Sequence, residues 1–220
     1  MAGSYGHPPG RQVLMSSEKS LNYACFAGTK LLARGDLRVV ATAAKAWVDA
    51  GGAEPVAVYA DETGRPVDLD LRDHLEDVLA RLDPPMESRE DEPTEPKRQG
   101  PGRPKLGVVS KEVTLLPRHW EWLASQPGGA SVTLRKLVEA ARRTSVAADA
   151  ARRSQEAAYR FISAMAGDNP GFEEASRALF AHDYMRFEQL VEPWPRDVRD
   201  HARRLVALAA RDHAAAMAER

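Results

Sequence analysis

The stretch Tyr23-Ala24-Cys25-Phe26-Ala27-Gly28-Thr29-Lys30-Leu31-Leu32-Ala33 decides the fold class, because it has the pattern of a β-hairpin. Residues 23–26 form an apolar, strand-like run, Gly28 allows a turn, and residues 30–33 can return as the partner strand. We therefore expect an antiparallel sheet in the N-terminal part of the chain.

The residues that follow extend the hairpin to a small ββαββ unit. Asp36 is expected to cap a helix over about 37–50. Two further strands are predicted at 56–59 and 67–71, the second because its apolar and polar residues alternate strictly. A short helix through Leu75, Val78, Leu79 and Leu82 completes the unit.

From residue 84 to residue 104 the chain is rich in proline and has no large apolar residue after Met86. This composition is typical of an extended linker, which cannot bury enough surface to fold alone. Beyond it we expect one strand, Lys111 to Leu116, and then only helices. The predicted helices lie near 117–126, 131–143 or 131–166, 171–191 with a break near Asp183, and 195–218.

The predicted fold class is therefore α+β, with a C-terminal helical bundle. The chain divides into a disordered leader (1–19), a small α+β domain (20–83), a linker (84–107), a strand-helix-helix segment (108–144) and a helical region (145–220).

Charge is unevenly distributed, although the chain has 31 Lys and Arg against 32 Asp and Glu, a net charge of −1. Residues 97–153 contain twelve basic and four acidic residues, a net charge of +8, so the rest of the chain carries −9. A local excess of this kind is expected of a protein that binds nucleic acid, because each Lys or Arg near a phosphate releases counterions. A solvated helix face is the alternative explanation.

Within the basic segment, Gly102-Arg103-Pro104 is flanked by Lys97, Arg98 and Lys105 and resembles an AT-hook. The resemblance implies an extended backbone in the minor groove of A·T-rich DNA, where Arg103 would enter a narrow groove of strongly negative potential. A plain Pro-Gly linker is the alternative, because such short motifs also occur by chance.

The lone strand Lys111 to Leu116 has no partner in its half of the chain, so we expect it to pair with the same strand of a second copy. Two helices follow it, separated by Pro127-Gly128-Gly129. This arrangement resembles the ribbon-helix-helix family, in which a two-stranded ribbon enters the major groove of DNA and the helices form the dimer core. A helix-turn-helix is the alternative, but it leaves the strand unexplained.

This resemblance assigns DNA contacts to particular residues. Thr114 would face the DNA if Val113 and Leu115 face the core, whereas the opposite register would expose Lys111. Ser131 is expected to cap the second helix, where backbone N–H groups would contact a phosphate. The candidate DNA-binding residues are Lys97, Arg98, Gly102, Arg103, Pro104, Lys105, Lys111, Thr114, Ser131, Arg135 and Lys136.

A wider resemblance rests on five motifs. They are Gly-Arg-Pro-Lys-Leu-Gly-Val-Val (102–109), Glu-Val-Thr-Leu-Leu-Pro-Arg-His-Trp-Glu-Trp-Leu (112–123), Gln-Pro-Gly-Gly-Ala-Ser (126–131), Phe-Glu-Glu-Ala (172–175) and Trp-Pro-Arg-Asp-Val-Arg-Asp-His (194–201). Over roughly residues 22–205 the chain resembles the bacterial family catalogued as domain of unknown function 2239. This resemblance implies no activity.

Other functional classes are excluded by what the sequence lacks. No run approaches the ~20 apolar residues that span a bilayer, and the amino terminus has no apolar core of a secretion signal. The single cysteine, Cys25, fits a reducing compartment, so we expect a cytoplasmic protein without a membrane partner. The histidines have no metal-ligand spacing, and no nucleotide-binding loop or nucleophile motif occurs. We therefore expect no metal, no cofactor and no enzymatic activity.

Two pairs of residues invite a catalytic or metal-binding interpretation. Asp197 and His201 are four residues apart on one helix, and Asp68 and Asp70 share one face of a strand. We interpret the first pair as an exposed ion pair and the second as a solvated strand face.

Together these observations favour a homodimeric, non-enzymatic DNA-binding protein, a transcriptional regulator or a nucleoid-associated factor, with an A·T-rich duplex as its partner. The alternative is a protein-interaction adaptor. In that case the acidic residues at 87–95 would shield the basic residues at 97–105 within one chain.

Overall fold

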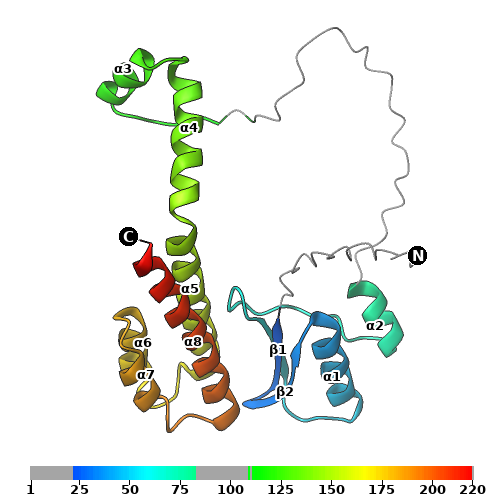
Figure 1. The fold of residues 1–220 in the computed structure, drawn as a ribbon. Coiled ribbons are helices and arrows are strands. Elements are labelled where there is room, and N and C mark those ends of the chain that lie inside the picture. The colour runs from blue at the N-terminus through cyan, green and yellow to red at the C-terminus, as the bar shows by residue number, and fades with distance from the viewer. Residues whose placement is uncertain (1–21, 83–108, 110, 220) are drawn as a thin grey trace, which may run out of the picture.

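The computed structural model describes residues 22–82, 109 and 111–219, and has a three-stranded antiparallel sheet between two layers of helices (Figure 1). The strands are β1 (Tyr23–Ala27), β2 (Lys30–Gly35) and β3 (Val56–Ala60), in the order β2-β1-β3. Gly28 turns the β1–β2 hairpin with a φ of +54°. The predicted hairpin and the α+β class are confirmed.

One face of the sheet is covered by α1 (Leu37–Asp49), as the apolar spacing of this helix predicts. The side chain of Asp36 accepts a hydrogen bond of 2.9 Å from the backbone N–H of Val39, which caps the helix. Cys25, Val40, Ala44 and Val58 form the buried cluster between α1 and the sheet. The short helix α2 (Leu75–Leu82) packs beside α1.

The fourth strand predicted at 67–71 is not formed, so the order ββαββ is wrong in its last element. After a single bridge between Tyr59 and Pro66 and one hydrogen bond from Val67 N–H to the Val58 carbonyl, the chain leaves the sheet. Val67, Leu69 and Leu71 still pack on the cluster under α1. The alternation therefore identified the apolar side of the segment, but the backbone at Arg72 bonds locally to the side chain of Asp70 instead of to a neighbouring strand.

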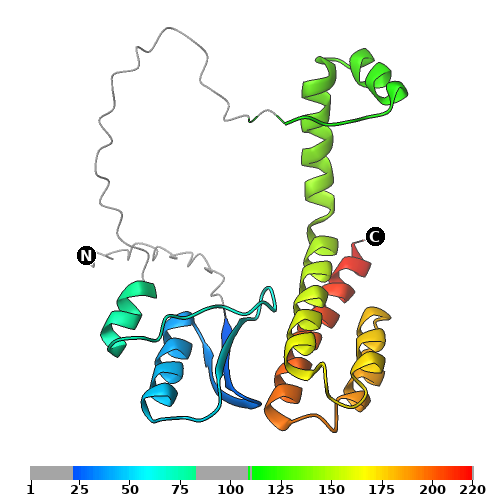
Figure 2. The same cartoon turned by 180° about the vertical axis from the view of Figure 1, so that it is seen from behind.

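The other face of the sheet is covered by a pair of long helices, α5 (Val146–Ala166) and α8 (Arg196–Ala218). Two shorter helices, α6 (Phe172–Phe180) and α7 (Tyr184–Leu190), lie on the side of this pair that faces away from the sheet (Figure 2). The break predicted near Asp183 is present, because its side chain accepts a hydrogen bond from Arg186 N–H and starts α7. The predicted C-terminal helices are therefore confirmed, with small shifts in their bounds.

The sheet and the α5–α8 pair share one hydrophobic cluster. The ring of Phe161 on α5 lies 5.7 Å from that of Phe26 and 5.3 Å from that of Tyr59, centroid to centroid. The imidazole of His201 on α8 lies 4.6 Å from the Phe161 ring. The regions before and after the proline-rich segment thus pack against each other across a common core.

Polar contacts reinforce this packing at two places. Asp197 of α8 accepts a hydrogen bond of 2.9 Å from Leu31 N–H of β2, and Arg160 of α5 donates one of 3.1 Å to the carbonyl of Thr63. Gly64, in the turn after β3, touches α5 so closely that a Cβ there would lie 2.0 Å from the carbonyl oxygen of Ala157.

The replacement Gly64→Ala tests this contact. Gly64 has a φ of +64°, so alanine costs about 1 kcal/mol for the left-handed backbone and about 1–3 kcal/mol more for the collision with Ala157. Gly51→Ala is the matched control, because Gly51 has a φ of +73° and open space around its Cβ position. Urea denaturation should show a clearly larger loss for Gly64→Ala, and equal losses would contradict the close contact.

The thiol of Cys25 should be unreactive in the folded protein. Burial raises the pKa of this thiol to about 11, so only about one thousandth of it is thiolate at pH 8. A chromogenic disulfide reagent should therefore modify Cys25 only after unfolding in guanidinium chloride, which provides the positive control. Rapid modification of the native protein would show that the α1 face of the sheet opens readily.

Candidate nucleic-acid interface

The candidate interface lies on an arm formed by residues 109 and 111–116, α3 (Pro117–Ser125) and α4 (Gly129–Thr144). Only Ser145 separates α4 from α5, so α4 extends the direction of α5 away from the body, and α3 folds back at its far end (Figures 1 and 2). Both helices occur where the sequence predicts them.

The second helix begins earlier than expected. Gly128, with a φ of +90°, is its N-cap residue, and no side chain caps the helix. Ser131 therefore lies within the first turn, exposed, and the prediction that it caps α4 is wrong. The glycines at 128 and 129 allow the chain to reverse direction, so the helix is capped three residues earlier than a cap at Ser131 would place it.

The segment predicted as a strand, Lys111 to Leu116, is not a strand in the isolated chain. Backbone groups form a ladder only beside a partner strand, and the part of the chain that the structure describes offers none here. Lys111 and Thr114 are exposed, and Leu116 has extended φ and ψ angles just before Pro117 starts α3.

The arm has several large apolar side chains that are exposed to solvent, whereas side chains of this kind are mostly buried or half-buried in the rest of the described chain. Leu123, on α3, is the one buried residue among those described between 109 and 144, and α4 buries none. Val138 is 64% exposed and Trp122 is 51% exposed. The other large apolar side chains exposed on the arm are Val109, Val113, Leu116, Trp120 and Leu137.

Beside these apolar residues are basic side chains without partners. In the described part of the chain, Lys111, Arg118, Arg135 and Lys136 form no ion pair or hydrogen bond, and all four are exposed. Arg142 and Arg143 differ, since both contact Glu139, at 3.4 and 3.3 Å. Over residues 109 and 111–144 the arm has six Lys and Arg against three Glu.

Six of the predicted DNA-binding residues lie outside the described residues. They are the AT-hook-like residues Lys97, Arg98, Gly102, Arg103, Pro104 and Lys105. The structure brings the remaining five (Lys111, Thr114, Ser131, Arg135 and Lys136) onto the arm, in two sections of chain joined by α3.

The interpretation of Asp197 and His201 as an exposed ion pair is wrong. Asp197 bonds to β2, and His201 is only 1% exposed, with its Nε2 atom 3.2 Å from Oδ1 of Asp61. This approach is too poorly aligned to count as a hydrogen bond. The sequence could not reveal the pair, because Asp61 and His201 are distant along the chain and meet only when the sheet packs on α8.

The pair Asp68 and Asp70 lies on an exposed segment, although not on a strand. Hydrogen bonds from Arg72 hold the pKa of the Asp70 carboxyl well below its usual range. Asp70 is therefore a stabilised carboxylate in a local ion pair, and it has none of the character of a general acid.

Two classes of site are not found within the described residues. Between residues 22 and 82 and from 109 onward, no three His, Cys, Asp or Glu side chains are grouped to hold a metal ion. In the same regions no helix combines the length and the apolar character needed to cross a bilayer.

Comparison with known proteins identifies the family of the chain. No curated protein and no solved structure matches the chain. A family model described as an uncharacterized protein conserved in bacteria, DUF2239, matches residues 22–206, which include the sheet, the arm, α5 to α7 and the first half of α8. The chain therefore belongs to the DUF2239 family of bacterial proteins.

Proposed function

We propose that this chain is a non-enzymatic DNA-binding protein that works as a homodimer through its α3–α4 arm, as a transcriptional regulator or a nucleoid-associated factor. The observation that supports the proposal most is the uncovered apolar surface of the arm, next to four basic side chains without partners.

The apolar surface supports dimerisation. Leu137, Val138 and Ala141 lie on one face of α4, and all three are exposed in the single chain. A contiguous exposed apolar surface of this kind marks an interaction site. A second copy of the chain would bury the apolar face of α4. It would also supply a strand to pair with residues 111–116 across a two-fold axis.

The basic side chains support a nucleic-acid partner. Arg135 and Lys136 are adjacent on α4 and point away from the 137–138–141 face by helical spacing, so a dimer would leave them accessible. The first turn of α4 has no side-chain cap, which leaves backbone N–H groups available to a phosphate. Arg103 would add a minor-groove contact from the segment preceding the arm, which would raise the overall avidity.

Oligomeric state tests the first half of the proposal. Sedimentation equilibrium should give a mass twice the 24.1 kDa of the chain, and Val138→Asp should give a monomer, because a carboxylate would then be buried without a partner. Met185→Asp is the control, since Met185 is 76% exposed on α7, away from the arm. A wild-type protein that stays monomeric at high concentration would exclude the proposed dimer.

DNA binding tests the second half. Fluorescence anisotropy should detect binding to A·T-rich and G·C-rich duplexes, measured over a salt series. The slope of the logarithm of the binding constant against the logarithm of the salt concentration should be smaller in magnitude by about two in the double variant Arg135→Gln, Lys136→Gln, about one for each phosphate contact removed. Arg177→Gln on α6 is the matched control, because its side chain is also exposed. Arg103→Ala should weaken binding mainly to the A·T-rich duplex.

The same experiment distinguishes the adaptor alternative. An adaptor would bind neither duplex even at low salt, and would retain a protein partner after nuclease treatment. If the protein binds either duplex, and the substitutions at Arg135, Lys136 and Arg103 weaken that binding as described above, an adaptor role is excluded as the sole function.

A further inference from the structure

We propose that a cavity between the turn after β3 and helices α5 and α8 binds a small organic anion, one that carries a carboxylate or phosphate group on an apolar body. The cavity has a volume of about 550 Å³, which lies in the range of ligand pockets. Its apolar wall includes Ala150, Leu205 and Leu208, and three arginines, Arg153, Arg204 and Arg211, stand around it. This proposal does not depend on DNA binding.

The three arginines retain unused hydrogen-bond donors. Arg153 makes no ion pair or hydrogen bond within the described residues. Arg204 lies 3.9 Å from Oδ2 of Asp61, and Arg211 lies 3.5 Å from Oδ1 of Asp212, and neither approach is a hydrogen bond. A guanidinium group has five N–H donors in a planar fork that matches a carboxylate or a phosphate, so these groups are suited to a ligand of that chemistry.

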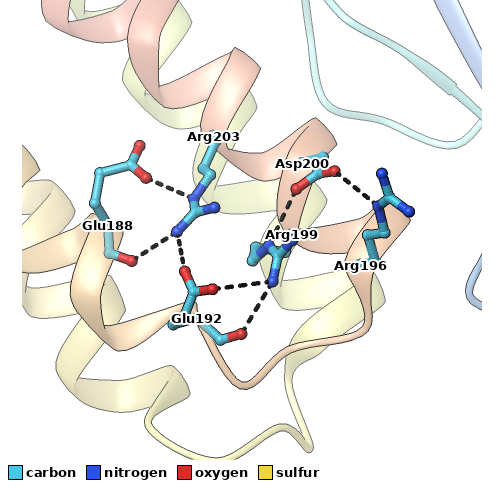
Figure 3. A network of polar contacts seen from close by, with 6 residues as sticks. All are labelled: Glu188, Glu192, Arg196, Arg199, Asp200 and Arg203. Atoms are coloured by element: carbon cyan, nitrogen blue, oxygen red, sulfur yellow. Dashed lines mark hydrogen bonds and ion pairs between the residues drawn. The ribbon is translucent and has the colours of Figure 1, made fainter.

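Other arginines of α8 show the contrast. On the side of α8 that faces α7, Arg203 donates to Glu192 at 2.6 Å, and Arg199 contacts the same carboxylate at 3.3 Å (Figure 3). Glu188 also contacts Arg203. These guanidinium groups are largely buried and neutralised, and they tie α7 to α8. The arginines that line the cavity contact carboxylates only at 3.5 Å or more, without a hydrogen bond, or, in the case of Arg153, form no ion pair within the described residues.

Three carboxylates, Asp61, Glu62 and Asp212, line the cavity beside the three arginines. Asp61 faces His201 and Arg204, and Asp212 faces Arg211. Within the described residues Arg153 forms no ion pair, so its guanidinium is the one available to an anionic group. A ligand whose anionic group lies at Arg153 would place its apolar body against Ala150 and Leu208.

Asp61 is a positioning residue for this site. It is 8% exposed, and its backbone N–H donates to the carbonyl of Asn22 at 2.8 Å. One carboxylate oxygen lies 3.2 Å from Nε2 of the buried His201, and the other lies 3.9 Å from Arg204. The Asp61 carboxylate thus holds the Arg204 guanidinium at the cavity without using its donors.

Binding of defined probes to the full chain tests the site. Phenyl phosphate and benzoate supply the two anionic groups on an apolar ring, benzyl alcohol supplies the ring without the charge, and inorganic phosphate supplies the charge without the ring. In ¹H–¹⁵N NMR titrations, both aromatic anions should shift the amide signals of Ser154, Ala207 and Leu208 saturably. Benzyl alcohol should not shift them, and phosphate should bind more weakly than phenyl phosphate.

Arg153→Gln should weaken binding of the aromatic anions at least tenfold. Because the Arg153 side chain is exposed, the variant should keep the fold, which the NMR spectrum itself reports. Arg196→Gln is the matched control, because Arg196 is an exposed arginine of α8 outside the cavity. The proposal is overturned if neither anion shifts the cavity amides, if Arg153→Gln binds as the wild type does, or if the shifts occur only around Arg135 and Lys136.

Discussion

The packing of the sheet on α5 and α8 is the interaction on which the rest of the structure depends. A three-stranded sheet with a single helix on one face leaves its other face, here Phe26 and Tyr59, open to water. Phe161 and His201 cover that face, and each large aromatic side chain buried there contributes about 2 kcal/mol. The hydrogen bond from Leu31 to Asp197 and the close contact at Gly64 then fix how the helices lie on the sheet.

Local sequence patterns predicted most of the elements. The Asp36 cap, the turn at Gly28 and the break at Asp183 each act through residues within three or four positions, so their effects can be inferred from short segments. The two predicted strands that are absent, 67–71 and 111–116, failed for the opposite reason. Alternating or β-rich residues indicate an extended chain, but a segment becomes a strand only when it pairs with the backbone of a neighbouring strand. For neither segment does the described chain provide a complete neighbouring strand.

The groups brought together by tertiary packing could not be predicted at all. Asp61 follows β3, Arg153 belongs to α5, and His201 and Arg204 belong to α8, so no spacing in the sequence relates them. The sequence does not show which of its histidines and arginines lie close together, because the packing of the sheet on the helices determines this. Basic residues, in contrast, were expected on the strand-helix-helix segment, and Lys111, Arg135 and Lys136 are exposed there without partners among the described residues.

The single residue between α4 and α5 has a mechanical consequence. Ser145 ends the hydrogen-bond ladder of α4, through its N–H to the Ala141 carbonyl, and begins that of α5, through its carbonyl, which accepts from Asp149 N–H. Any change of angle at this residue therefore moves the whole of α4. Since α4 has 16 residues, each rising about 1.5 Å, a rotation of about 10° at Ser145 would displace the tip of the arm by about 4 Å. A small change of angle at the base of α5 is thus enlarged along α4. In the proposed DNA complex, this displacement would exceed the spacing of neighbouring base pairs, about 3.4 Å.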